Sequence, residues 1–474
     1  MTYDRNSGRD RLPQPGIRLP RPGIRLSVEL DGDPHPDRSA RIEAHVQVDV
    51  AADGVPGDLP ADRLAVVIAV DVAEPNRAAV RHALPAVLRA LPDRMSFAVL
   101  GSGPEPVRCY PRGDAPWAVA DREERRRAAF VAGALPLHRD GPRPAGYAAW
   151  VAASRILLAA RPVPVRHLVL ITDGSSAAGE TRLEAELDAC EGQFSCHVFA
   201  VGADWAPDPL LTLAERLHGA AEFVDDGLGR AITQAIHRLL KIHTPQLPIE
   251  VTVRPTVRKV SLSESSPRPY LLGGLRLPGP PMRWSFPTHQ WEQGRRDYLL
   301  TLTADADADP LGTELQFAMV TIGDVHAPVT ARWRLPGQSP PPGPAGTGSV
   351  RALNDTARMH TALRQGLLAV KQQQRDAAED YLGQAARLAA RRGESWALDE
   401  IRTVADIEDS PAMRVRLRHV DTSSLGSMIL RVGSRAGLPP AETTGTRPGV
   451  RCVHCATPGG SEARYCIACG KELR

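Results

Sequence analysis

The run LAVVIAVD, residues 64–71, decides the fold that we expect for this chain. It is a continuous apolar stretch, rich in β-branched residues, and it ends in an aspartate. Such a run is typical of a strand that is buried on both faces of a parallel sheet. A second run of this kind, HLVLITD, occupies residues 167–173, and helices are predicted between the two at about 77–90 and 147–160. Strands that alternate with helices predict a mainly parallel, doubly wound α/β sheet, which we place in residues 61–243.

The alternation of strands and helices continues through the rest of this interval. Further strands are expected at 97–101 and 197–202. Further helices are expected at about 183–191, 209–217 and 228–242. We assign all of these elements to the same α/β domain.

Short strands with alternating apolar and polar residues flank this domain on both sides. IRLSVEL (24–30) and RIEAHVQVDV (41–50) precede it, and five such segments without helix signals between them follow it. This period of two is typical of half-buried strands, and a series of them predicts an antiparallel β-sandwich. We expect residues 247–335 to form the sandwich, with strands from 24–60 joining it, so that the α/β domain is an insertion within it.

Smaller units are predicted for the rest of the chain, which is therefore multidomain. A Pro/Gly linker (336–350) leads into a helical region (351–410) that begins with a helical hairpin resembling a tetratricopeptide unit. Partner binding, dimer packing and simple core packing are equally compatible with that hairpin. A basic flexible tail (411–448) and a four-cysteine module (449–474) follow. Residues 1–23 are predicted to be disordered.

Composition and charge exclude some functional classes and leave others open. The 474 residues carry a formal net charge of only +3, and aromatic residues make up 4 % of the chain. The segment 411–474 has ten Lys/Arg and four Asp/Glu residues, so a basic tail is available to acidic partners, nucleic acid included, or is simply solvated. No signal peptide and no apolar run of about 20 residues is visible, which predicts a soluble, cytoplasmic protein without a membrane partner.

The strongest chemical motif is a pair of CxxC sequences near the end of the chain. Cys452 and Cys455 form the first pair, and Cys466 and Cys469 form the second after ten intervening residues. Four thiolates on two tight turns provide the tetrahedral sulfur coordination that zinc prefers. A module of about 25 residues cannot bury enough apolar surface to fold alone, so we predict a structural zinc ribbon. A redox dithiol is the alternative, and no thioredoxin-like context supports it.

The α/β segment resembles the von Willebrand factor A family. The resemblance rests on IAVDV (68–72), LITDG (170–174), HVFAVGAD (197–204) and LLTLAERLHG (210–219), with their order and spacing over about 175 residues. Another doubly wound fold with a chance TDG sequence is the alternative. The resemblance implies a doubly wound domain that binds a protein ligand at the carboxyl ends of its strands.

The resemblance also implies a metal-ion-dependent adhesion site, but only part of its ligand set is present. Asp71 matches the aspartate of the family's DxSxS loop, and Asp173 matches the later aspartate. The two serine positions fall on Ala73 and Pro75, and no threonine lies at 143–146, where the family's threonine is expected. Two carboxylates without hydroxyl partners make a poor Mg²⁺ site, because Mg²⁺ prefers near-octahedral oxygen coordination. We therefore interpret Asp71 and Asp173 as remnants of a degenerate site, where they cap neighbouring loops or helices.

These features favour a non-enzymatic protein-interaction scaffold. No phosphate-binding loop, nucleophile elbow or HExxH sequence is present. The alternatives are a Mg²⁺-dependent ligand-binding protein and a nucleic-acid-associated factor that acts through the basic tail and the ribbon. Bacterial proteins of similar layout accompany Ser/Thr kinases and phosphothreonine-reading proteins. That likeness implies a signalling assembly as the setting and Thr422 as a phosphosite, with an ordinary polar linker as the alternative for this segment.

Overall fold

The computed structural model describes most of the chain between residues 23 and 435. The described residues are 23–37, 39–51, 59–73, 76–101, 105–133, 145–174, 182–202, 205–266, 270–335, 337, 348–408, 413–418 and 422–435. Cys452, Cys455, Cys466 and Cys469 therefore lie outside the described residues, as does Pro75.

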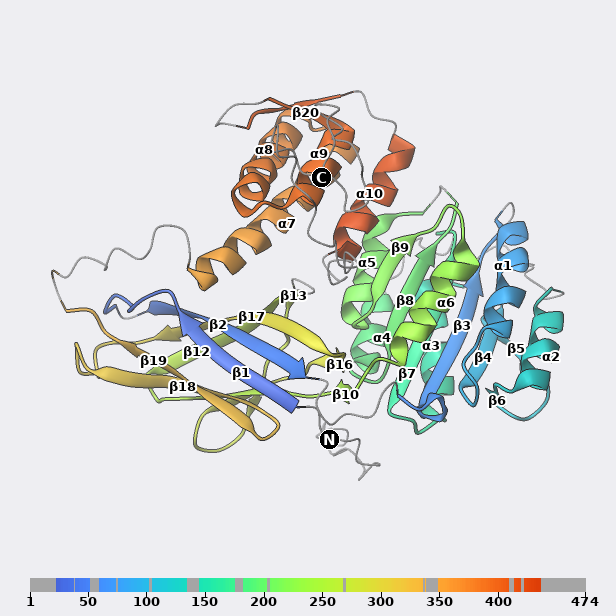
Figure 1. The fold of residues 1–474 in the computed structure, drawn as a ribbon, viewed down its shortest axis with the longest axis horizontal. Coiled ribbons are helices and arrows are strands. Elements are labelled where there is room, and N and C mark those ends of the chain that lie inside the picture. Colours follow the sequence, from blue (N-terminus) through green and yellow to red (C-terminus); the bar gives the residue numbers. More distant parts are fainter. Residues whose placement is uncertain are drawn as a thin grey trace, which may run out of the picture. The chain divides into compact units, whose positions relative to one another are not determined.

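The predicted α/β domain is confirmed, and its sheet is mixed (Figure 1). Its strands lie in the order β5-β4-β3-β7-β8-β9, with β6 also pairing with β4. The pairs β3–β4, β3–β7, β7–β8 and β8–β9 are parallel, whereas β5 and β6 run antiparallel to β4. The strands are β3 (Leu64–Asp71), β4 (Ser96–Gly101), β5 (Val107–Tyr110), β6 (Ala118–Val119), β7 (Val165–Thr172), β8 (Ser195–Ala200) and β9 (Ala220–Phe223).

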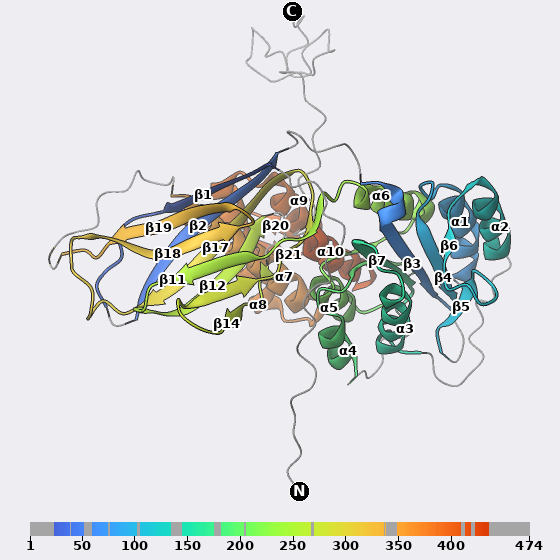
Figure 2. The same ribbon diagram turned by 90° about the horizontal axis from the view of Figure 1, so that it is seen from below.

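Helices cover both faces of this sheet (Figure 2). One face contacts α1 (Arg77–Arg89), which packs on α2 (Arg122–Gly133), and α6 (Leu228–Leu239). The other face contacts α3 (Tyr147–Ala159), α4 (Leu183–Cys190) and α5 (Pro207–Arg216). A single turn of 3-10 helix, Ala61–Arg63, precedes β3.

The central strand β3 explains why the domain needs two layers of helices. All eight of its residues are buried. Leu64, Val66, Ile68 and Val70 belong to one core, and Ala65, Val67 and Ala69 belong to the other. Since side chains alternate across a strand, an uninterrupted apolar run can only be buried when both faces of the sheet are covered.

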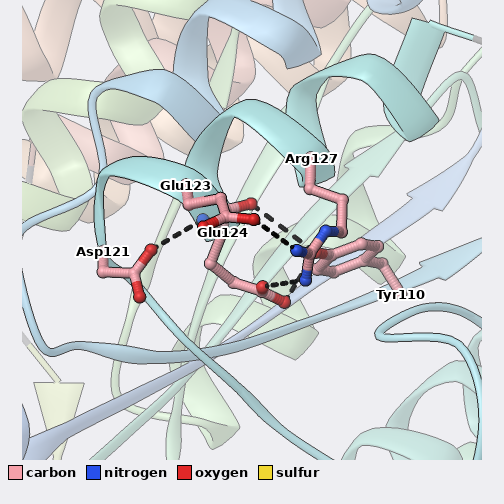
Figure 3. Close-up of polar contacts among 5 residues, drawn as sticks. All are labelled: Tyr110, Asp121, Glu123, Glu124 and Arg127. Carbon is pink, nitrogen blue, oxygen red and sulfur yellow. Dashed lines mark hydrogen bonds and ion pairs between the residues drawn. The ribbon is translucent and has the colours of Figure 1, made fainter.

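The sequence reading overlooked α2, and polar contacts explain where that helix begins (Figure 3). The Asp121 carboxylate accepts a hydrogen bond of 2.7 Å from the Glu124 backbone N–H, which is a helix N-cap. Glu124 also accepts a 2.6 Å hydrogen bond from the Tyr110 hydroxyl. Arg127 pairs with Glu123 and Glu124 at 2.7 and 2.9 Å. Burial, and then the hydrogen bond to Glu124, raise the pKa of Tyr110, so this hydroxyl stays protonated and remains a donor.

Two five-stranded sheets, built from strands before and after the α/β domain in the sequence, share a third core. One sheet has the order β1-β2-β17-β12-β13 and the other β14-β15-β11-β18-β19. The N-terminal strand β2 pairs with β17 along eleven residues, which joins segments more than 240 positions apart. The strands are β1 (Gly23–Leu30), β2 (Ala40–Ala51), β11 (Ile249–Val253), β12 (Val257–Ser266), β13 (Tyr270–Leu271), β14 (Leu275–Leu277), β15 (Arg283–Phe286), β17 (Gly294–Ala304), β18 (Glu314–Ile322) and β19 (Val325–Arg332). A short ribbon of β10 (Thr244–Gln246) and β16 (His289–Trp291) lies where the chain leaves the α/β domain.

The helical region is larger than expected. It comprises α7 (Ser349–Lys371), α8 (Arg375–Arg392) and α9 (Ser395–Val404), then the paired strands β20 (Ala405–Ile407) and β21 (Val415–Leu417), and finally α10 (Thr422–Arg435). Our prediction of a flexible tail at 411–448 therefore needs correction between 413 and 435. The physical reason is an amphipathic pattern: the apolar side chains of Leu425, Met428, Ile429 and Val432 recur at helical spacing and are buried.

Helix α10 packs on the α/β domain. It contacts β9 and α5 as well as α7. Its glycines allow this, because a Cβ on Gly433 would lie 2.5 Å from Leu211, and one on Gly426 would lie 3.4 Å from the ring of Trp205. Arg431 also donates two hydrogen bonds, of 2.8 and 2.9 Å, to the buried carboxylate of Glu400 in α9. The α/β sheet and the helical region consequently share one core.

Two histidines are held in environments that disfavour the charged imidazolium. His289 stacks on His218 with ring centroids 3.9 Å apart, and burial followed by the charge of Arg296 lowers its pKa to about 4. His360 packs on Trp396 with ring centroids 5.2 Å apart, and burial lowers its pKa to about 4 as well. In the folded protein both imidazoles therefore stay neutral until the pH approaches 4. In the unfolded chain the same histidines, with a pKa near 6.5, already bind protons at higher pH.

This environment predicts a loss of stability in mild acid. A depressed histidine pKa stabilises the fold fully above about pH 6.5, and this contribution disappears as the pH falls toward 4. Each histidine contributes at most roughly 3 kcal/mol to that loss. Urea unfolding of wild type between pH 7.5 and 4.5 should show it, and the His289→Phe and His360→Phe variants should each show a shallower pH dependence. The exposed His82, replaced by Gln, is the control, and equal slopes in all four proteins would contradict the assignment.

Candidate functional site

The candidate site lies at the carboxyl ends of β3 and β7, where the order of the sheet reverses. Along the chain, β4 follows β3 but lies on one side of it, whereas β7 lies on the other side. In open α/β sheets, ligands bind at such a switch point. The parallel register places Asp71, the last residue of β3, beside Thr172, the last residue of β7. The sequence-predicted pair Asp71 and Asp173 is thus brought together.

Both carboxylates are almost completely buried. Asp71 is 1 % exposed and Asp173 is 4 % exposed. A buried carboxylate is costly unless hydrogen-bond donors compensate for its lost hydration. The contacts of these two residues therefore decide what the site can bind.

The protein's own groups provide donors to both carboxylates. Asp173 accepts a hydrogen bond of 2.5 Å at Oδ2 from the backbone N–H of Ala73. Asp71 accepts one of 3.1 Å at Oδ2 from the hydroxyl of Thr172, and its backbone carbonyl accepts one of 3.2 Å from the N–H of Asp173. The loop after β3 and the turn after β7 are thereby tied together.

Thr172 is the site residue that the sequence reading missed. Its hydroxyl also accepts a 3.1 Å hydrogen bond from the N–H of Gly174 and lies 3.4 Å from the hydroxyl of Tyr147, the first residue of α3. The signal was present in the sequence, because Thr172 directly precedes Asp173 in LITDG. The family's threonine was expected at 143–146. Residues 143 and 144 lie outside the described part of the chain, and Gly146 is the N-cap of α3.

Two described residues that follow β8, Gly202 and Trp205, pack against neighbouring loops. The indole N–H of Trp205 donates a 2.9 Å hydrogen bond to the carbonyl of Gly202. A Cβ on Gly202 would lie 2.6 Å from the amide nitrogen of Asn76, at the start of α1. A Cβ on Gly174 would lie 2.2 Å from that of Trp205. Glycine is therefore required at both positions by close packing of the loops, and both also have positive φ angles.

This packing predicts a specific cost for Gly174→Ala. The residue has a φ of +82°, and the added methyl group would collide with the backbone of Trp205 as well as with its side chain. We expect a loss of more than about 2 kcal/mol in the free energy of unfolding, measured by urea denaturation. The matched control is Gly393→Ala, which has a φ of +70° but no atom within 4 Å of the new Cβ, so it reports backbone strain alone. Equal losses in the two variants would show that the contact with Trp205 does not constrain the turn.

Comparison with known proteins supports the same description of this domain. Residues 64–223 match the family model of the von Willebrand factor type A domain. A search of the curated proteins found no match. Among solved structures, the von Willebrand factor type A protein from Catenulispora acidiphila is similar, with a TM-score of 0.74 and 20 % sequence identity over 89 % of this chain and 98 % of that one.

A second solved structure is similar over nearly the same length. It is the ArnB paralog VWA2 from Sulfolobus acidocaldarius, with a TM-score of 0.51 and 9 % identity over 87 % of this chain and 98 % of that one. Both likenesses reach far beyond the α/β sheet, so they include the flanking β-sheets or helices. Residues 64–223 of this chain thus form a von Willebrand factor type A domain.

Proposed function

We propose that this chain is a non-enzymatic, cytoplasmic scaffold whose von Willebrand factor A domain recognises a protein partner without a bridging Mg²⁺ ion. The observation that carries the proposal is the 2.5 Å hydrogen bond between the Ala73 N–H and the Asp173 carboxylate. Through this bond, the Asp173 carboxylate holds the loop after β3, which contains Ala73 and position 75 of the motif.

The residues at the site do not fit a magnesium ion of the kind that the family implies. Ala73 has no side-chain oxygen, and neither has a proline at position 75. The Ala73 N–H already donates to Asp173 Oδ2, so a metal at that oxygen would compete with a half-buried backbone donor.

Recognition of a protein is the function that the rest of the chain supports. The site is built from loops on a rigid sheet, an arrangement that suits binding. Of the helices within the described ranges, none is long and apolar enough to cross a bilayer. The partners that we propose are components of a bacterial signalling assembly, namely Ser/Thr kinases or phosphothreonine-reading proteins. Thr422, the predicted phosphosite, is the first residue of α10.

The second element of the proposal is a structural zinc ribbon formed by Cys452, Cys455, Cys466 and Cys469. Its support is the spacing of the two CxxC pairs. The cysteines within the described part of the chain, Cys109, Cys190 and Cys196, form no disulfide there. Their thiols are buried or half-buried, and burial raises the pKa of each, so they are poor competitors for zinc at neutral pH.

The proposed recognition mode predicts binding that is independent of Mg²⁺. Isothermal titration of the purified chain with MgCl₂ should give no Asp71-dependent affinity tighter than about 1 mM, so that wild type and Asp71→Ala behave alike. Affinity capture with tagged full-length protein should retrieve the same partners in EDTA as in Mg²⁺. A variant that lacks residues 449–474 then distinguishes partners of the ribbon from partners of the von Willebrand factor A domain. A submillimolar affinity that Asp71→Ala abolishes would reinstate the metal-dependent mode.

The ribbon predicts one zinc ion per chain. Elemental analysis of protein purified without added metal should find about one equivalent of zinc, and Cys452→Ser or Cys469→Ser should lower it to near zero. Cys109→Ser is the control and should leave the zinc content unchanged. Protein that contains no zinc after mild purification, or that keeps its zinc in both ribbon variants, would refute the assignment.

A further inference from the structure

A groove of about 250 Å³ lies between the helices α7 and α8. Its lining includes the small side chains of Ala357 and Ala362. Its walls carry polar side chains from both helices, namely Asn354, Arg358, Thr361, Tyr381 and Gln384. No carboxylate lines it.

All the polar side chains of this groove can donate hydrogen bonds, and most of them have no partner within the described residues. The exposed guanidinium of Arg358 forms no ion pair or hydrogen bond within the described residues. The hydroxyl of Tyr381, which is 41 % exposed, likewise has no partner in that part of the chain. Asn354 is the exception, since its amide donates a 3.0 Å hydrogen bond to Glu43, a residue whose own charge is paired with Arg41 at 2.5 Å.

The two helices also carry an excess of positive charge. Residues 349–392 contain eight Lys/Arg and four Asp/Glu residues, a local net charge of +4, whereas the whole chain is only +3. Asp355, the one acidic residue of α7, pairs with Arg391 at 3.9 Å. A segment that enters the groove therefore meets an unpaired guanidinium in a positive field, with neutral donors beside it.

We propose that the groove between α7 and α8 docks an acidic segment of a protein partner, with Arg358 pairing with one of its carboxylates. Guanidinium binds carboxylate in a planar, charge-assisted fashion. Thr361, Tyr381 and Gln384 complete the site by donating hydrogen bonds to the segment's backbone carbonyls or to a second acidic side chain. The surface is independent of the Asp71–Asp173 site, so either proposal can fail without the other.

Fluorescence anisotropy with a fluorescein-labelled decaglutamate peptide and the full-length protein tests this inference. Wild type should bind the peptide at 50 mM salt, with an affinity that falls as salt is added. Arg358→Gln should weaken binding about ten- to a hundredfold, the range expected for a lost charge-assisted hydrogen bond. Tyr381→Phe should weaken it by a smaller factor, because it removes one neutral donor.

The matched control is Arg392→Gln, which removes an exposed arginine from the last residue of α8, outside the groove. The affinity of Arg392→Gln for the decaglutamate peptide should equal that of wild type once the salt concentration is adjusted for the lost charge. A labelled Gly-Ser decapeptide should not bind to wild type. Circular dichroism and melting curves verify that the variants are folded. The inference is overturned if wild type does not bind, if the two arginine variants weaken binding equally, or if equimolar inorganic phosphate displaces the peptide, which would assign the groove to a small anion.

Discussion

The pairing of β3 with β7 is the constraint on which the rest of this structure depends. It aligns eight residue pairs and ends with Asp71 beside Thr172. Because the two strands are parallel, their carboxyl ends coincide, and the residues that follow them face one another. A slip of one residue would turn Asp71 away from Thr172 and would exchange the two apolar faces of β3. The pairing register of β3 with β7 therefore also sets the geometry of the site.

Burial of the two aspartates turns that geometry into a rigid connection between loops. A carboxylate that is 4 % exposed, such as Asp173, has lost nearly all contact with water and depends on donors from the protein. A hydrogen bond to a charged group contributes about 1.5–3 kcal/mol, so the Ala73 N–H is a substantial part of that compensation. A metal ion at this oxygen would compete with that donor. Alanine at position 73 offers no side-chain oxygen to a metal, but its backbone N–H still donates to Asp173. This favours the hydrogen bond that connects the loop after β3 to the turn after β7.

The sequence predicted the parts of the fold that depend on local pattern. The buried strands and the contribution of the N-terminal strands to a β-sheet follow from hydrophobic periodicity, whereas Asp71 and Asp173 were identified by resemblance to the motifs of the von Willebrand factor A family. The helices α2 and α10 were overlooked for different reasons. The motif Asp121-x-x-Glu124, a capping signal, begins α2, but this helix is Arg-rich and of low hydrophobicity, so no apolar pattern marks it. For α10, glycines and serines made the segment resemble a linker, although Leu425, Met428 and Ile429 carry helical spacing.

The contacts of Trp205 could not be predicted from local pattern, because they join three distant segments. The residue touches the turn after β7 at Gly174, the edge strand β9 at Phe223, with ring centroids 5.5 Å apart, and α10 at Gly426. Only a folded chain shows that Gly174 faces the backbone and Cβ of Trp205 while Gly426 faces its indole ring. One consequence is that α10 cannot be regarded as part of a loose tail. It is held through Trp205 against the same turn that carries Asp173, so a partner that moves this turn must also disturb the packing of α10.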